Sequence, residues 1–141
     1  MQASQTLMRF AVLCAGLALA ATPGAAPAQS VTVAMGHALL FSLDHGQPAQ
    51  VREAPAGAVP AAGEMLVAVR PMLGTTMSAT GNMPRGVRYR ATLIFANGGT
   101  GEARACVLPA GRQTAFEHWP KAVVGVRLDR FRPAPASSAC R

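Results

Sequence analysis

The stretch VRYRATLIF at residues 87–95 decides the fold class of this chain, and NGGTG follows it at residues 97–101. In this stretch every odd position carries an apolar residue, and the even positions carry arginine, threonine and isoleucine. Side chains of a β-strand alternate between its two faces, so the pattern predicts a strand. Asn and Gly tolerate positive φ, and we therefore expect a tight turn and a return strand over residues 102–108.

The apolar pattern also predicts how this hairpin pairs. If the odd positions face inward on both strands, Phe95 lies opposite Ala103. Cys106 and Arg104 then lie on the outer face of the hairpin, away from the core. The alternative register turns Cys106 inward but also buries Glu102 and Arg104, which costs free energy.

The same alternation recurs along the rest of the chain. Residues 31–43 alternate with one exception, Leu40, and form a run too long for one ordinary strand. We expect a break at Gly36 that gives two strands or one bent strand. Residues 122–131 favour a strand, although Val124, Leu128 and Phe131 also have helical spacing. Further strands are expected at 50–53, 64–70, 72–83 and 113–119.

Short strands separated by turns rich in Gly and Pro are typical of an all-β protein. The sequence predicts an antiparallel β-sandwich, immunoglobulin-like in architecture, or a small barrel. We expect a single β domain over residues 29–132 and a C-terminal tail over residues 133–141.

The N-terminus has the three parts of a secretory signal peptide. Arg9 is followed by an apolar run at residues 10–21 and by Ala-Pro-Ala at residues 26–28. The run is shorter than the roughly twenty residues that span a bilayer, and no later run is long enough. We expect residues 1–28 to be cleaved, leaving a periplasmic or secreted chain that starts at Gln29 and has no membrane span.

Cleavage would leave two cysteines, Cys106 and Cys140. Disulfides persist outside the cytoplasm, so we predict that these residues pair and tie back the tail. On the chain-entropy model such a bridge stabilises the fold by roughly 3 to 4 kcal/mol. An intermolecular bridge or two free thiols are the alternatives.

The sequence argues against catalysis. It contains no nucleophile elbow, zinc-protease motif or phosphate-binding loop, and it has six carboxylates in all. We therefore expect no enzyme and no cofactor. His37 follows Met35 and precedes several further methionines, a combination that suits copper, but their irregular spacing assigns no metal ligand.

The chain is basic, with 13 Lys and Arg against 6 Asp and Glu. Arg88, Arg90 and Arg104 are expected to share the outer face of the hairpin and form a weak anion-binding surface. Acidic lipid, polysaccharide or an envelope protein are the candidate partners. Aromatic residues make up 5% of the chain, which leaves few platforms for nucleic-acid bases. A second basic group, expected near the C-terminal end, consists of Arg127, Arg130, Arg132 and Arg141.

These features predict an exported, non-catalytic binding or structural module of the cell envelope. Two alternatives remain open. In one, residues 31–43 complete the sheet of a neighbouring copy, which would make the chain a strand-exchanging assembly subunit. In the other, the chain is a periplasmic copper-binding protein.

Overall fold

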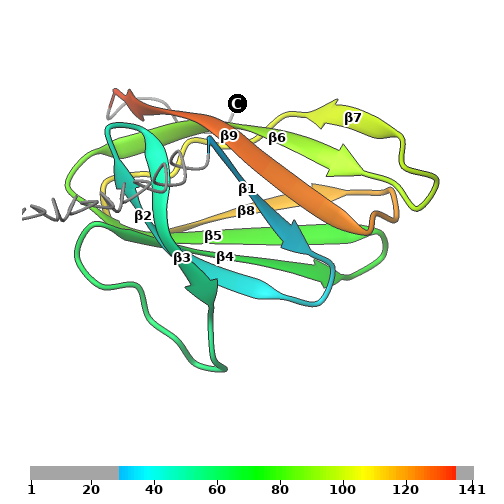
Figure 1. The fold of residues 1–141 in the computed structure, drawn as a ribbon, viewed down its shortest axis with the longest axis horizontal. Helices are drawn as coiled ribbons and strands as arrows, with labels where there is room; N and C mark the ends of the chain where they lie inside the picture. Colours follow the sequence, from blue (N-terminus) through cyan, green and yellow to red (C-terminus); the bar gives the residue numbers. More distant parts are fainter. Residues whose placement is uncertain (1–28, 136–141) are drawn as a thin grey trace, which may run out of the picture.

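The structure, a computed structural model that describes residues 29–135, is all-β and contains two antiparallel sheets (Figure 1). One sheet has four strands in the order β1-β9-β6-β7, and the other has five in the order β3-β2-β4-β5-β8. The all-β, antiparallel prediction is confirmed, and the two-sheet arrangement is that of a β-sandwich. The strands are β1 (Ser30–Ala34), β2 (Ala38–Asp44), β3 (Gln47–Glu53), β4 (Glu64–Pro71), β5 (Thr75–Met83), β6 (Gly86–Ile94), β7 (Thr100–Ala103), β8 (Gly111–Trp119) and β9 (Gly125–Ala134).

Both sheets contribute side chains to one hydrophobic core. Phe41, Met65 and Met77 come from the five-stranded sheet, and Leu128 and Phe131 come from the four-stranded one. The rings of Phe41 and Phe131 meet edge to face across the core, with centroids 5.7 Å apart. Burying one such side chain contributes about 1.5–3 kcal/mol, so the contact between the sheets is the main source of stability.

The predicted break at Gly36 is confirmed. Gly36 has a φ of 86°, and the turn that contains it ends β1 and leads into β2. The two strands belong to different sheets, β1 beside β9 and β2 between β3 and β4. The backbone N–H of Gly36 donates to the carbonyl oxygen of Val69 at 2.9 Å, which fixes the turn to the five-stranded sheet.

The predicted register of the hairpin is wrong. Ala103 lies opposite Ala91, and the strands close at the pair Ile94 and Thr100. Phe95 belongs to the turn instead, because its N–H donates to the carbonyl oxygen of Gly99 at 2.9 Å. The loop is therefore shorter than the prediction assumed.

The predicted return strand also ends early, at Ala103. The next residues leave β7, and Leu108 forms an isolated bridge with Val87 before β8 joins the other sheet. Leu108 is fully buried in the core, and Cys106 packs half-buried against it. The expectation that Cys106 lies on the outer face of the hairpin is corrected accordingly.

Residues 125–134 form a strand, β9, and not a helix. The strand continues to Ala134, so it includes two residues of the segment that was expected to be tail. Residues 1–28 and Cys140 lie outside the described part of the chain. The signal peptide and the bridge between Cys106 and Cys140 therefore remain predictions.

Candidate functional site

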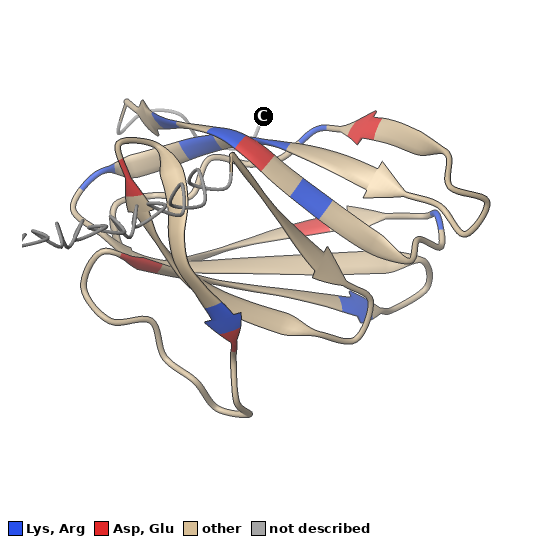
Figure 2. Cartoon of the chain, in the orientation of Figure 1, with Lys and Arg blue, Asp and Glu red and all other residues tan. Residues whose placement is uncertain are grey.

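The outer face of the four-stranded sheet carries a band of arginines where β6 and β9 lie side by side (Figure 2). Residues far apart in the sequence meet here because β6 pairs with β9 along most of its length. The hairpin group and the C-terminal group of arginines are therefore largely one surface. This basic band consists of Arg88 and Arg90 from β6 and of Arg127, Arg130 and Arg132 from β9.

A β-bulge in β9 turns Arg130 and Arg132 to the outer face of the sheet. Arg90 lies opposite Asp129 and Arg88 lies opposite Arg132, so that Arg130 and Phe131 together face one residue of β6. Arg130 has a φ of 55°, in the left-handed region. With this extra residue, Arg130 and Arg132 are both exposed and Phe131 stays buried. Without the bulge, simple alternation would turn Arg130 toward the core.

Asp129 neutralises one arginine of the band. Arg90 donates from Nε to Oδ1 of Asp129 at 2.7 Å and from Nη2 to Oδ2 at 2.8 Å, a two-pronged ion pair. Glu102 also reaches Arg90, at 3.3 Å, and Nε of Arg127 lies 4.0 Å from Asp129. The hydrogen bonds from Arg90 lower the pKa of Asp129 below its ordinary value, so this carboxylate remains ionised at neutral pH.

Arg88, Arg130 and Arg132 lack such a partner in the described part of the chain. Among residues 29–135, no ion pair joins Arg88, Arg130 or Arg132 to an acidic side chain. Arg88 lies directly opposite Arg132 on the neighbouring strand, an arrangement in which like charges destabilise a sheet. The band therefore has an uncompensated positive charge that an anion would relieve.

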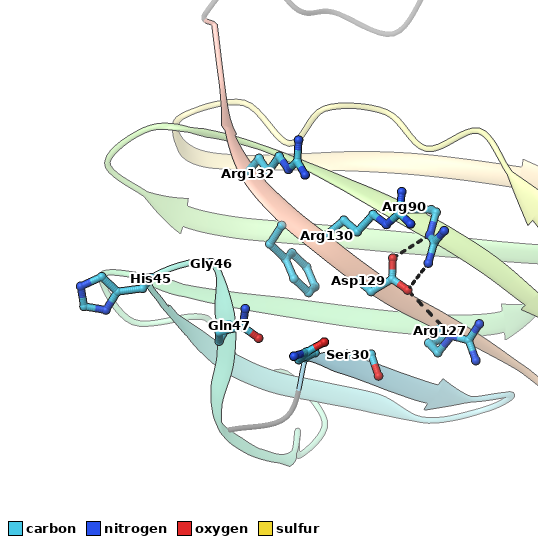
Figure 3. Close-up of a pocket in the computed structure, with 11 residues that line it drawn as sticks. Ser30, His45, Gly46, Gln47, Arg90, Arg127, Asp129, Arg130 and Arg132 are labelled. Atoms are coloured by element: carbon cyan, nitrogen blue, oxygen red, sulfur yellow. Dashed lines mark hydrogen bonds and ion pairs between the residues drawn. The ribbon is translucent and has the colours of Figure 1, made fainter. Parts of the chain in front are cut away.

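Beside the band lies a shallow cleft of about 540 Å³ (Figure 3). Ser30, which pairs with Asp129 of β9, borders the cleft together with the β2–β3 turn at His45 and Gly46 and with Gln47 at the start of β3. The turn packs closely on β9, because a Cβ atom on Gly46 would lie 2.9 Å from the carbonyl oxygen of Phe131. The charged residues that line the cleft are Arg90, Arg127, Asp129, Arg130 and Arg132, together with the ionisable His45.

The wall of the cleft also contains a buried acceptor. The side-chain oxygen of Gln47, Oε1, is inaccessible to solvent and has no hydrogen-bond partner among the described residues. Leaving such an atom unsatisfied costs about 1–3 kcal/mol.

The structure changes the predicted anion-binding surface in part. Arg88 and Arg90 share a face as expected, although Arg90 is already paired with Asp129. Arg90 lines the cleft, Arg88 lies on the band outside it, and Arg104 follows the end of β7 and belongs to neither. Arg130 and Arg132 take its place, and their contribution depends on the pairing of β6 with β9, which no local pattern reveals.

The residues considered for copper lie apart from this cleft. His37 is in the turn between β1 and β2, where its Nδ1 atom is 3.4 Å from the carboxylate of Glu53. Met65 and Met77 are fully buried in the core. Within residues 29–135, no three His, Cys, Asp or Glu side chains lie close enough together to hold a metal ion.

The described strands and turns include no helix long and apolar enough to cross a membrane. Five arginines of the described residues lie on β6 and β9, which pair with each other. No family model, curated protein or solved structure matches the sequence or the fold.

Proposed function

We propose that this chain is an exported, non-catalytic binding module whose basic band, together with the cleft beside it, holds a phosphate or carboxylate group of an acidic envelope component. The observation that carries the proposal is the direct opposition of Arg88 and Arg132, with Arg130 turned to the same face by the bulge. Such a local conflict, kept without an internal counter-ion, is typical of a functional site.

The chemistry of the band supports an anion as its ligand. Guanidinium groups hold phosphate and carboxylate oxygens through paired N–H donors. Three arginines without an acidic partner stand on a rigid pair of strands, so a bound anion would need little rearrangement of the backbone. The turn at His45 and Gly46 closes one side of the cleft and gives the ligand a defined position.

The signal peptide over residues 1–28, the periplasmic or secreted location and the immunoglobulin-like architecture of the sandwich are parts of the same proposal. The Arg9 region, the short apolar run and the Ala-Pro-Ala site support export. An exported chain meets acidic lipid and polysaccharide at the envelope, which makes these the relevant sources of an anionic group.

The binding proposal predicts that added salt lowers the affinity for anionic vesicles and that replacing Asp129 raises it. Affinity for vesicles that contain an anionic phospholipid should fall steeply as salt rises, because surface charges are screened beyond about 8 Å at physiological ionic strength. Asp129→Asn should raise the affinity several-fold, since it removes the acid that lines the cleft and releases Arg90. Vesicle co-sedimentation over a salt series measures both effects.

The matched control is Glu53→Gln on β3, which raises the net charge by the same amount but lies outside the cleft. We expect it to leave vesicle binding nearly unchanged. Binding that does not respond to salt, or a folded Asp129→Asn protein with weaker binding, would contradict the proposal. Urea unfolding of each variant establishes that it is folded.

Export and the disulfide are tested together by the mass of the protein recovered from outside the cytoplasm. We expect a chain that begins at Gln29 and gains two mass units on reduction, as one internal bridge between Cys106 and Cys140 requires. Full-length chain in the cytoplasm would refute export. Two free thiols, or a dimer lost on reduction, would refute the internal bridge.

A further inference from the structure

An apolar slot of about 150 Å³ adjoins the basic cleft. Its walls come from the end of β2, from the β5–β6 turn and from β9. Apart from the charged Arg85 and Arg132 at its border, the lining is apolar or glycine. The apolar members are Leu43, Met83, Pro84, Val87, Phe131 and Pro133.

The slot and the cleft are continuous at three residues. Gly46, Phe131 and Arg132 line both hollows. The contact between the β2–β3 turn and β9 therefore separates a basic side from an apolar side, and Arg132 borders each of them. A ligand that fits both must carry an anionic group next to a short apolar segment.

We propose that this pair of hollows binds an anionic lipid through its phosphate and the first carbons of its chain. The phosphate lies against Arg130 and Arg132, and the chain enters the slot between Met83 and Pro133. This inference rests on the proposed function and names the ligand class for the same site. An acidic polysaccharide has no apolar segment to fill the slot, so the slot favours lipid.

The size of the slot limits how much of a chain it can hold. A water molecule takes up about 30 Å³ in the liquid, so 150 Å³ corresponds to roughly five groups of that size. About five methylene groups would fill the slot, and the rest of a longer chain would stay outside.

The test uses inorganic phosphate and a series of n-alkyl phosphates from ethyl to octyl, titrated by calorimetry below their micelle concentrations. Affinity should rise about fourfold with each added methylene, the increment for burying one such group, and level off near five carbons. Inorganic phosphate should bind most weakly. A rise of this form with a plateau supports a slot of fixed length.

The variant that tests the slot is Met83→Gln, which nearly preserves side-chain volume but places a polar amide in the lining. It should flatten the chain-length series and leave the affinity for inorganic phosphate unchanged. Met72→Gln is the control, because Met72 is exposed in the β4–β5 turn and does not line the slot. It should reproduce the wild-type series.

Two failures can be told apart. If inorganic phosphate binds and the series is flat, the lipid inference is overturned, while the anion site stands and a soluble phosphate or polysaccharide becomes its ligand. If neither phosphate nor any alkyl phosphate binds, and vesicle binding is also absent, the proposed function itself falls.

Discussion

Replacing Arg88, Arg130 and Arg132 together should weaken binding to anionic vesicles about 100-fold. The variant is Arg88→Gln, Arg130→Asn and Arg132→Gln. Each arginine near an anionic surface contributes about 1 kcal/mol, and three such losses multiply to about two orders of magnitude. Co-sedimentation at low salt, where the wild-type protein binds most tightly, measures the loss.

The same triple variant should remain as stable as the wild type, within about 1 kcal/mol. Arg88 and Arg132 face each other with like charge, so neutralising them removes a repulsion. Asparagine suits position 130, because it tolerates the φ of 55° that the bulge requires. Urea unfolding should therefore separate lost binding from lost folding.

The matched control neutralises three cations elsewhere, Arg104→Gln, Arg112→Gln and Lys121→Gln. These residues lie outside the basic band and line neither the cleft nor the slot, and the net charge changes by the same amount. We expect the control to retain most of the binding. An equal loss in both triple variants would show that net charge alone drives binding and would refute a localised site.

The two triple variants also test two versions of the site. Arg104 belongs to the surface that the sequence predicts, whereas Arg130 and Arg132 belong to the band that the structure contains. Arg104 was included because the hairpin register placed it on the same face as Arg88. Period-two alternation does not distinguish registers that differ by an even number of residues, since the same side chains stay inward. The observed pairing of Ala91 with Ala103 differs in this way from the predicted pairing of Phe95 with Ala103.

A hydrogen bond within the turn helps to set the hairpin register, which the alternation of apolar residues leaves undetermined. The side-chain oxygen of Asn97 accepts a hydrogen bond from the N–H of Gly99 at 2.9 Å, which tightens the turn. The strand directions and the break at Gly36 follow from residues near each other in sequence, and these were predicted. The pairing of β6 with β9 joins segments about 40 residues apart, and it depends on the whole fold.

The sequence contains one sign of the bulge, but this sign also suits a helix. Leu128 and Phe131 are three residues apart, a spacing that suits a helix. In the structure both are buried because the bulge inserts Arg130 between the alternating positions of a strand. A run of alternating apolar residues interrupted by one added polar residue can thus indicate a bulge, and bulges often lie beside functional sites.

The second large effect concerns Val33 in β1, and it decides between a self-contained fold and strand exchange. Val33→Asp should abolish most of the folding stability, at least about 4 kcal/mol, because it places an unpaired carboxylate in the core. Val33 is fully buried, and Val31, two residues earlier in the same strand, is 3% exposed. A domain of this size is stable by roughly 5–15 kcal/mol, so the loss should be evident in a urea titration.

The neighbouring substitution Ala34→Asp provides the control, because Ala34 is exposed and lies opposite Gly125 on β9. It introduces the same side chain into the same strand but should change stability by less than about 1 kcal/mol. If residues 31–43 instead completed the sheet of a neighbouring copy, Val33→Asp would leave a folded monomer that no longer assembles. Sedimentation and urea unfolding of the two variants distinguish these outcomes, and a folded, monomeric Val33→Asp protein would overturn the self-contained fold. We expect the opposite result, because β2 lies between β3 and β4 and β1 closes the four-stranded sheet against β9, so the segment is already bound on both sides of its break at Gly36.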